Sequence, residues 1–553
     1  MKPVPPVTTT RIPLGSTAVP GVANLITELE GRLRPLEVEV GRAWWEFSTR
    51  TSEETDRRRQ EAELRLREAL SDRDTFAAVS DARQGAARGS LERRRLDVLF
   101  QQMQPNQLDA DLRRRIVELE TKVEGVYNTH RGEIDGERVN DNRIEEILLN
   151  SDDVDLRRKA WEASKSVGGA VAAMVLDLVR LRNEAARSLG YRDHYAMALA
   201  LDDLDEDRLL ATLDEVDAAT AAPFAEWKGR LDAERAGRFG CAVGDLRPWH
   251  YDDPFFQEPP RVAGLDLDEH FAAADLESLT LRTYEGLGLD VRPVMEQSDL
   301  YSREGKSQHA FCIHIDREGD VRVLSNNVPN ERWASTMLHE FGHAAYDRYI
   351  DVGLPFVLRA PSHMLATEAV AMLFGRRSRD PDWLAGVGGM SADRLERTRA
   401  VLAETQRGAG LVFARWALVV VQFERGLYHD PDADHDRRWW DLVERHQRIA
   451  RPESRSGRAA GDGAVGSPDW AAKIHLAVAP VYYQNYLYGE LMASQLDAAL
   501  KACAGGVVNR VEAGKWLVEH VFRPGAAKRW DELVADATGE PLSARHFVAQ
   551  VSV

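Results

Sequence analysis

Hydrophobic positions recur along most of the chain with the three-to-four-residue spacing of amphipathic helices. From about Val22 to about Tyr127 the sequence is highly charged, and stretches such as S-E-E-T-D-R-R-R-Q-E-A-E-L-R-L-R-E-A-L suit helices with one solvated face. The same periodicity continues through R-I-E-E-I-L-L-N and V-L-D-L-V-R-L-R-N-E-A-A-R-S-L-G-Y. The pattern therefore predicts a mainly α-helical protein.

Alternation with the two-residue period of a β-strand is clear in one region. The stretches S-Q-H-A-F-C-I-H-I and V-R-V-L-S flank the turn-like D-R-E-G-D. This arrangement predicts a β-hairpin set among helices. The next two predicted helices surround His339 and Glu368, and long helices continue to the end of the chain.

Composition narrows the choice of partners. The 553 residues carry a formal net charge of -18, which argues against nucleic acid, because proteins that bind it usually present a basic face to the phosphates. The three cysteines, Cys241, Cys312 and Cys503, are far apart and suggest neither a disulfide framework nor a thiolate zinc site. Neither a signal-peptide pattern nor an apolar run of about 18 residues occurs, so we expect a cytoplasmic protein without membrane contact.

The stretch M-L-H-E-F-G-H-A-A-Y-D, residues 337–347, carries candidate metal chemistry. On a helix, His339 and His343 lie on one face about 6 Å apart along the axis, so both imidazoles can reach one ion. Glu340 is turned about 100° away, which suits a base acting on a water molecule beside the ion. The motif predicts a catalytic zinc site, with one ion per chain.

Such a site needs a third protein ligand. Asp347 lies about 12 Å along the axis from His339, too far for one ion on a straight helix. A third histidine further along the helix is excluded because Tyr346 and Tyr349 occupy the relevant positions. The remaining strong candidate is Glu368, in M-L-A-T-E-A-V-A-M-L-F, on a separate helix that can pack against the first.

With these residues the chain resembles the angiotensin-converting enzyme family of zinc metallopeptidases, which are gluzincins and peptidyl-dipeptidases, and more distantly the thimet oligopeptidase group. H-E-F-G-H matches the family's H-E-M-G-H, L-P-F-V-L-R matches L-P-V-S-L-R, and L-V-R-L-R-N-E-A-A-R-S-L-G-Y-R-D matches Y-V-E-L-S-N-E-A-A-R-L-N-G-Y-V-D. We expect the resemblance to run from about Glu124 to about Leu500, and more weakly on either side. It implies a large helical gluzincin fold with two halves around a deep cleft and a small β-hairpin beside the metal helix.

The resemblance also implies residues that bind substrate. His309 and Ala310, thirty residues before His339, match a strand that pairs with the bound peptide through backbone groups. In A-K-I-H-L-A-V-A-P-V-Y-Y-Q-N-Y-L-Y, Lys473 corresponds to the lysine that receives the substrate's C-terminal carboxylate. His475 corresponds to the histidine that binds a substrate carbonyl and the tetrahedral species.

One inserted residue aligns Y-Q-N-Y with the family's Y-I-R-Y. This alignment gives Tyr483 as a carboxylate contact and Tyr486 as the phenol that stabilises the oxyanion, with Tyr482 and Tyr488 as competitors for both roles.

Three positions depart from the family pattern. Asn485 replaces an arginine that helps to hold chloride, and Met372 stands where the family has an aspartate. The segment R-P-W-H-Y-D-D-P shows no clear equivalent of the family's carboxylate-binding glutamine. Among the properties that the resemblance implies, chloride activation and strict release of dipeptides are therefore less well supported than peptide hydrolysis.

The resulting hypothesis is a zinc peptidase that hydrolyses short peptides and releases C-terminal dipeptides, with Glu340 as the base and with His475 and Tyr486 as donors to the oxyanion. We expect an extended segment over residues 1–21 and one helical catalytic domain over 22–553, with two subdomains that enclose the cleft. The alternatives are an oligopeptidase that cleaves internally, a maturation peptidase of a biosynthetic pathway, and a non-hydrolytic peptide-binding protein.

Overall fold

The computed structural model describes residues 20–260, 266–452 and 468–552. Over these residues the protein is mainly helical, as predicted, with two small two-stranded sheets. The predicted extended segment 1–21 lies outside the described residues except for Pro20 and Gly21, where the first helix begins. The division into that segment and one catalytic domain over 22–553 stays a prediction.

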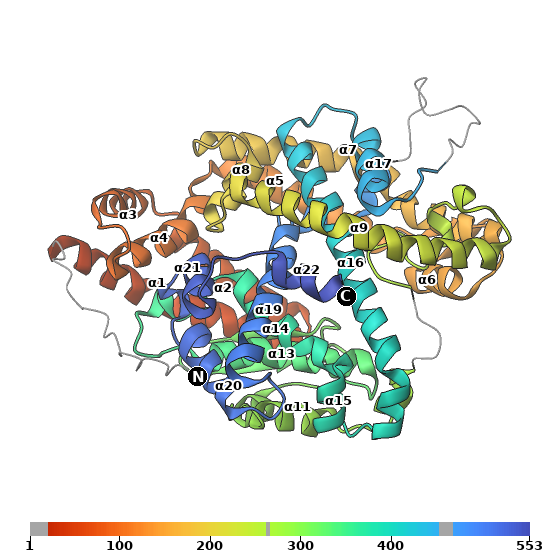
Figure 1. Cartoon of the computed structure of the whole chain (residues 1–553). Coiled ribbons are helices and arrows are strands. Elements are labelled where there is room, and N and C mark those ends of the chain that lie inside the picture. The colour runs from red at the N-terminus through yellow and green to blue at the C-terminus, as the bar shows by residue number, and fades with distance from the viewer. Residues whose placement is uncertain (1–19, 261–265, 453–467, 553) are drawn as a thin grey trace.

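The N-terminal helices are long and charged, as their sequence pattern predicts. Helices α1, α3 and α4 lie toward the left of Figure 1, and α2 and α5 lie nearer its centre. The five helices are α1 (Pro20–Thr49), α2 (Glu53–Leu70), α3 (Arg73–Gly85), α4 (Leu91–Met103) and α5 (Ala110–Thr129).

A short hairpin and four helices follow, and the long helices α7 and α9 lie at the top of Figure 1. The elements are β1 (Gly132–Ile134), β2 (Glu137–Val139), α6 (Asp141–Asn150), α7 (Val154–Ser188), α8 (His194–Leu201) and α9 (Glu206–Phe239). Strands β1 and β2 are antiparallel, and Asp135 and Gly136 at their turn both have positive φ. This hairpin is not predicted in the sequence analysis, although an Asp-Gly pair between short strands is a recognised hairpin signal. Only the later hairpin, which precedes His339, is predicted there.

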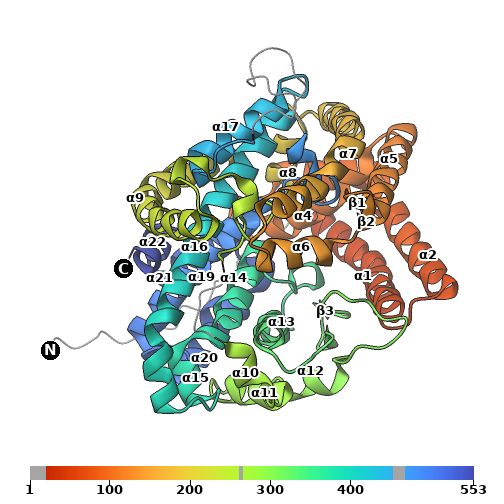
Figure 2. The same cartoon turned by 90° about the vertical axis from the view of Figure 1, so that its right-hand side faces the viewer.

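The middle of the chain carries the predicted hairpin and the two helices with candidate metal ligands. Strands β3 and β4 pair antiparallel, with Phe311 opposite Leu324 and His314 opposite Val321, and β3 lies beside α13 (Figure 2). The elements are α10 (Leu267–Phe271), α11 (Leu276–Glu285), α12 (Arg292–Gln297), β3 (Phe311–His314), β4 (Val321–Leu324), α13 (Glu331–Tyr349) and α14 (Met364–Gly375).

The C-terminal part is again helical, and α19 packs against α14 near the centre of the molecule. The elements are α15 (Pro381–Gly386), α16 (Ala392–His429), α17 (His435–Gln447), α18 (His475–Val478), α19 (Tyr483–Ala504), α20 (Val511–Leu517), α21 (Trp530–Thr538) and α22 (Arg545–Val551). None of the described helices combines the length and hydrophobicity that a bilayer-spanning helix needs.

Two hydrophobic cores hold these elements. The main core takes in buried residues from Val123 to Val551, and includes the inner faces of α13, α14, α16 and α19. The smaller core joins α1, α3 and α4 to Phe356–Leu358, the short 3-10 turn between α13 and α14. The N-terminal helices therefore rest on the segment that links the two candidate metal-binding helices. The predicted cleft between two halves stays a prediction.

Candidate metal centre and substrate site

Helix α13 places His339 and His343 on one face. Asn330 caps the helix by accepting a hydrogen bond from the backbone N–H of Trp333, so the helix begins at Glu331, eight residues before His339. The two imidazole rings lie with their centroids 4.9 Å apart and nearly perpendicular to each other. The i, i+4 spacing thus brings the rings together as the sequence predicts.

Helix α14 supplies Glu368. Its Oε2 atom lies 3.7 Å from Nε2 of His339, and ligand atoms of His339, His343 and Glu368 all fall within 4.8 Å of one another. This is the one group with metal-ligand geometry among the residues that the structure describes. Asp347 is not part of it, because its Oδ1 atom faces Nδ1 of His314 on β3 at 4.0 Å.

Close packing of α13 on α14 depends on the glycine in H-E-F-G-H. A Cβ atom on Gly342 would lie 2.8 Å from Cα of Ala371 and 3.2 Å from the carbonyl oxygen of Val370. The hydroxyl of Ser335 also donates a hydrogen bond to the carbonyl of Gly375, at the far end of α14. The short distance between the helices brings Glu368 within reach of both histidines.

Thr367 orients one of these histidines. Its Oγ1 atom lies 2.7 Å from Nδ1 of His343, which leaves Nε2 of that ring for an ion. Thr367 is missed by the sequence analysis. Its position next to Glu368 on a helix that packs against α13 is the only signal that could have pointed to it.

Burial sets the charge state of the group. It lowers the pKa of His339 to about 4 and, with the neighbouring His339, that of His343 to about 3, so both rings are neutral and able to ligate metal. Burial raises the pKa of Glu368 to about 7. Two imidazoles and a carboxylate are a donor set that suits zinc, and a bound cation would favour the ionised carboxylate.

Glu340 lies beside this group and is buried. Burial, and to a smaller extent the carboxylate of Glu368, raise its pKa to about 8, although a hydrogen bond from the backbone N–H of Cys312 acts to lower it. Because Cys312 lies on β3, the hairpin directly contacts the candidate base. A carboxyl group with a raised pKa in this position can both accept and return a proton near neutral pH.

His309 and Ala310 lie just before β3 rather than within it. His309 is exposed, Ala310 is half-buried, and the strand begins at Phe311. Among the described residues β3 pairs only with β4, so its other edge remains available for a further strand.

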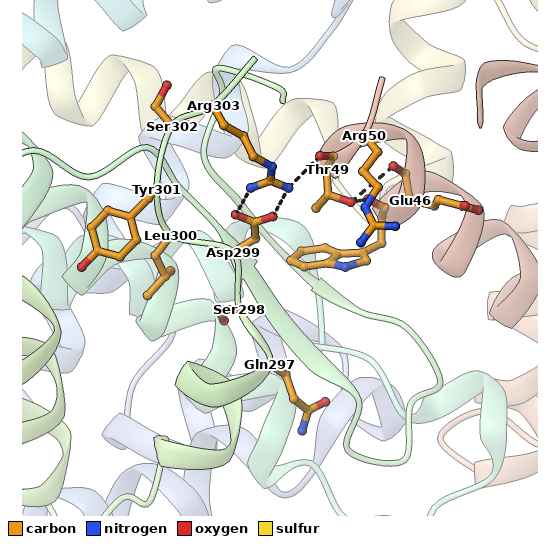
Figure 3. Close-up of a pocket in the computed structure, with 11 residues that line it drawn as sticks. Glu46, Thr49, Arg50, Gln297, Ser298, Asp299, Leu300, Tyr301, Ser302 and Arg303 are labelled. Atoms are coloured by element: carbon orange, nitrogen blue, oxygen red, sulfur yellow. Dashed lines mark hydrogen bonds and ion pairs between the residues drawn. The ribbon is translucent and has the colours of Figure 1, made fainter. Parts of the chain in front are cut away.

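Helix α1 supports the start of this strand. The backbone N–H of Ser307 donates to the carbonyl of Ser48, and Trp45 packs edge-on against Phe311. Figure 3 shows the adjoining cavity of about 640 Å³, where Arg303 bridges Asp299 and the carbonyl of Thr49. Trp45 lines this cavity, but none of the predicted site residues does. The cavity lies where α1 is tied to the segment before β3, and is not part of the candidate site.

A second cluster surrounds Lys473. Its Nζ atom donates a hydrogen bond to Oε1 of Gln257 at 2.7 Å and lies 5.4 Å from the ring centroid of Tyr483. Burial lowers the pKa of Lys473, Asp253 and Glu258 partly offset this effect, and the resulting pKa is about 8. Gln257 lies three residues beyond R-P-W-H-Y-D-D-P, the segment in which no carboxylate-binding glutamine is recognised above. The structure thus brings a glutamine to Lys473 that the sequence analysis misses.

The tyrosines of α19 fall into different environments. Tyr483 accepts a hydrogen bond from Trp416 and packs on His475, with ring centroids 5.2 Å apart. Tyr486 is half-buried, its ring centroid lies 5.5 Å from that of Tyr483, and Glu368 raises its pKa in addition to burial. Tyr482 also faces Glu368, whereas Tyr488 packs against Trp530. Tyr488 therefore points away from the metal group, and Tyr482 remains a competitor of Tyr486.

His475 links the two clusters. Burial, together with the charge of Lys473, lowers the pKa of His475 to about 4. Its Nδ1 atom is buried and has no hydrogen-bond partner among the described residues. A neutral imidazole with a free ring nitrogen next to Tyr483 is available to a bound molecule.

The fold and this site together define a class of protein: a helical protein with a half-buried His-His-Glu group that could hold a metal ion, as in zinc metallopeptidases. The family model Peptidase_M2, angiotensin-converting enzyme, matches residues 20–223 and confirms the predicted resemblance over this range. The match begins earlier than expected, in the charged N-terminal helices, and ends before the metal helix. Family match and metal geometry therefore come from different parts of the chain. A search among curated proteins found no match.

Proposed function

We propose that this chain is a zinc-dependent peptidase that releases dipeptides from the C-termini of short peptides. The observation that carries the proposal is the half-buried group of His339, His343 and Glu368 beside the buried Glu340. Peptide hydrolysis is also what the family match over residues 20–223 implies. A cytoplasmic location stays a prediction from the sequence.

Glu340 is the proposed general base. Zinc held by the three ligands would supply a Lewis acid that polarises the peptide carbonyl and acidifies a water molecule. Glu340 accepts the proton of that water and returns it to the leaving amine, and its raised pKa suits both transfers.

Tyr486 and His475 are the proposed donors to the negative charge that develops on the carbonyl oxygen. Tyr486 faces Glu368, and His475 offers a buried ring nitrogen that has no hydrogen-bond partner in the described parts of the chain. Donors arranged before the reaction stabilise the transition state without a cost of reorganisation.

The proposed C-terminal specificity rests on Lys473. Its ammonium group, with Gln257 and Tyr483 beside it, offers a charged hydrogen-bond donor to a carboxylate. The free edge of β3, preceded by His309 and Ala310, offers backbone groups to an extended peptide.

Mass spectrometry of products separates this proposal from its alternatives. The substrates are one short peptide with a free C-terminal acid and its amidated twin. Successive loss of dipeptides from the acid alone supports the proposal, whereas equal internal cleavage of both peptides indicates an oligopeptidase. Tight binding of both without cleavage indicates a non-hydrolytic peptide-binding protein.

Glu340→Gln tests the chemistry. We expect this variant to keep its zinc, because Glu340 is not a ligand, and to lose turnover by about three orders of magnitude or more. Zinc content by elemental analysis and initial rates on the acid peptide measure the two effects. Near-normal hydrolysis by the variant would refute the role of Glu340.

A further inference from the structure

Asp347 carries a nearly buried carboxylate that the proposed mechanism does not use. Its side chain is 13 % exposed. It lies on α13 seven residues after Glu340, and seven residues are close to two helical turns. Both carboxyl groups therefore project from one face of the helix, about 10 Å apart along its axis. Strand β3 packs on α13, and a carboxylate in such a place needs compensating contacts because its removal from water is costly.

Two side chains of β3 meet this carboxylate. Sγ of Cys312 lies 4.0 Å from Oδ2 of Asp347, within reach of a weak S–H hydrogen bond, and Nδ1 of His314 lies 4.0 Å from Oδ1. Alternate residues of a strand project to the same side, so Cys312 and His314 share the inner face of β3. Asp347 therefore lies between the helix and the inner face of the strand.

The ring proton of His314 faces Asp347. The backbone N–H of Gly319 donates to Nε2 of His314 at 3.2 Å, so this nitrogen carries no proton. Burial lowers the pKa of His314 to about 4, and the neutral ring therefore carries its one proton on Nδ1. In the described parts of the chain, the buried Nδ1 atom has no hydrogen-bond partner, and Oδ1 of Asp347 faces it. The attraction between this N–H and the carboxylate draws the strand toward the helix.

The same strand reaches the candidate base. The backbone N–H of Cys312 donates a hydrogen bond to Glu340. Burial, then Asp347 and Glu340, raise the pKa of the Cys312 thiol, so this side chain lies near both carboxyl groups. A shift of β3 relative to α13 would therefore displace the donor to Glu340 and the free edge of the strand together.

We propose that Asp347 is a positioning residue, which fixes β3 on α13 through Cys312 and His314. It thereby holds the N–H of Cys312 on Glu340 and the free edge of β3 beside the metal group. Such a backing matters because a displacement of about 1 Å from the reactive geometry costs about 100-fold in rate. The inference rests on the proposed function, which assigns Glu340 as the base and this strand edge to an extended peptide.

Asp347→Ala is the first test. The variant lacks the carboxylate, and we expect kcat on the acid peptide to fall about tenfold and KM to rise about tenfold at unchanged zinc content. Asp347→Asn keeps a side-chain oxygen at the same place and should recover most of both parameters. A general loss of structure would lower only the apparent kcat, through a smaller active fraction. Initial rates and elemental analysis measure these quantities.

Asp290→Ala is the matched control. The carboxylate of Asp290 is exposed and lies 3.9 Å from Arg348, the residue next to Asp347 on α13. The substitution therefore removes a carboxylate beside the same helix without touching the contacts of Cys312 and His314. Both kinetic parameters should stay within about twofold of the wild type.

His314→Ala approaches the same contact from the strand. It removes the ring and leaves Asp347 in place, and it should change kcat and KM in the same direction as Asp347→Ala. The double variant should be little worse than either single variant, because the two residues act through one contact. Losses that add fully in the double variant overturn the inference.

Amide hydrogen exchange of the zinc-loaded, full-length protein separates this inference from the proposed function. Exchange in Phe311–His314 should be at least about tenfold faster in Asp347→Ala than in the wild type, and unchanged in Asp347→Asn and Asp290→Ala. This result supports the role of Asp347 even if no peptide is hydrolysed. Unchanged exchange in Asp347→Ala, or a fall in kcat without a rise in KM, overturns the inference.

Discussion

A hydroxyl group outside the sequence motif orients one of the candidate metal ligands. With Nε2 of His343 directed to an ion, Nδ1 carries the proton and donates to Oγ1 of Thr367 at 2.7 Å. Thr367→Val removes this acceptor at nearly constant volume. We expect zinc affinity to fall about 10- to 100-fold, measured by competition with a chelator.

The control for this variant is Thr405→Val. The hydroxyl of Thr405 donates to the carbonyl of Val401 within α16 and does not contact the metal group. Its loss should leave zinc affinity unchanged. An unchanged affinity in Thr367→Val as well would contradict the orienting role.

Chloride dependence is also decided by single residues. Asn485, which replaces the arginine of the family pattern, donates a hydrogen bond to Oδ2 of Asp202 at 3.0 Å. Asp202 also lies 3.1 Å from Nε2 of His363 through its other oxygen. A carboxylate beside a neutral amide offers no attraction to an anion. We expect equal rates of peptide hydrolysis in chloride and in acetate at constant ionic strength, and activation of several-fold by chloride would contradict this.

At the scale of elements, the spacing of α13 and α14 depends on Gly342. A Cβ at this position would lie 2.8 Å from Cα of Ala371, and α14 would have to move outward with Glu368. We expect Gly342→Ala to lower the free energy of unfolding by about 1–3 kcal/mol and to weaken zinc binding. Urea denaturation and chelator competition measure the two effects.

Gly169→Ala is the matched comparison for Gly342→Ala. Gly169 is a helical glycine on α7, and a Cβ there would meet nothing within 4 Å. Alanine should therefore stabilise the protein by about 0.5–1 kcal/mol through helix propensity alone. Stabilisation of similar size in both variants would show that the helix spacing has no effect on the site.

The turn between α18 and α19 is held by two buried residues from distant helices. Glu424 on α16 accepts a hydrogen bond from the backbone N–H of Val481 at 2.7 Å, and Arg182 on α7 donates to the carbonyl of Ala477 at 2.6 Å. Val481 has a φ of 54°, an uncommon value for a β-branched residue. This strained turn connects His475 to the tyrosines of α19.

Glu424→Ala tests whether the turn positions these donors. The variant leaves the N–H of Val481 without its acceptor, and we expect kcat to fall about tenfold or more while zinc content stays constant. Glu424→Gln keeps an acceptor and should recover most of the activity. Steady-state kinetics and zinc analysis distinguish a displaced turn from a general loss of structure. Equal kcat in the wild type and in both variants would contradict the positioning role of Glu424.

The sequence predicts a feature of the fold or of the candidate site only where the residues that form it are close together in the chain. His339 and His343 share one helix and β3 and β4 share one hairpin, so periodicity and turn residues are sufficient to find them. Gln257 and Lys473 are 216 residues apart, and no local pattern connects them. Thr367 is missed for a related reason, because its role depends on how two helices pack. Glu368 is predicted only because zinc chemistry requires a third ligand.

At the scale of the whole molecule, Asp203 joins the N-terminal helices to the C-terminal segment. Its carboxylate accepts hydrogen bonds from Arg94 at 2.6 Å, from Gln101 at 2.8 Å and from Arg529 at 2.8 Å. The carbonyl of Asp203 also accepts from Trp530 on α21. The helices α1 to α4 share their own small core with Phe356–Leu358, which is their first connection to the rest of the protein. The hydrogen bonds around Asp203 form a second connection.

Asp203→Asn should therefore destabilise the protein in a pH-dependent way. Burial alone would raise the pKa of Asp203, but Arg94 and Arg529 lower it below its usual value of 3.8. A lowered pKa means that the ion pairs stabilise the folded state fully above the unfolded pKa, and that this contribution is lost as the pH falls through the folded pKa.

At about pH 7 we expect the free energy of unfolding of Asp203→Asn to be about 3 kcal/mol lower than that of the wild type, since Arg94 is left buried with only neutral partners. Near pH 3 the difference should shrink, because this pH lies below the usual pKa of 3.8, so the unfolded chain binds a proton that the ion-paired carboxylate of the folded state resists. Urea denaturation at both pH values measures the difference. The exposed pair of Asp111 and Arg114 supplies the control, as Asp111→Asn should change stability little at either pH. If the free energies of unfolding of Asp203→Asn and the wild type instead differ by the same amount at both pH values, Asp203 acts through shape and hydrogen bonding and not through its charge.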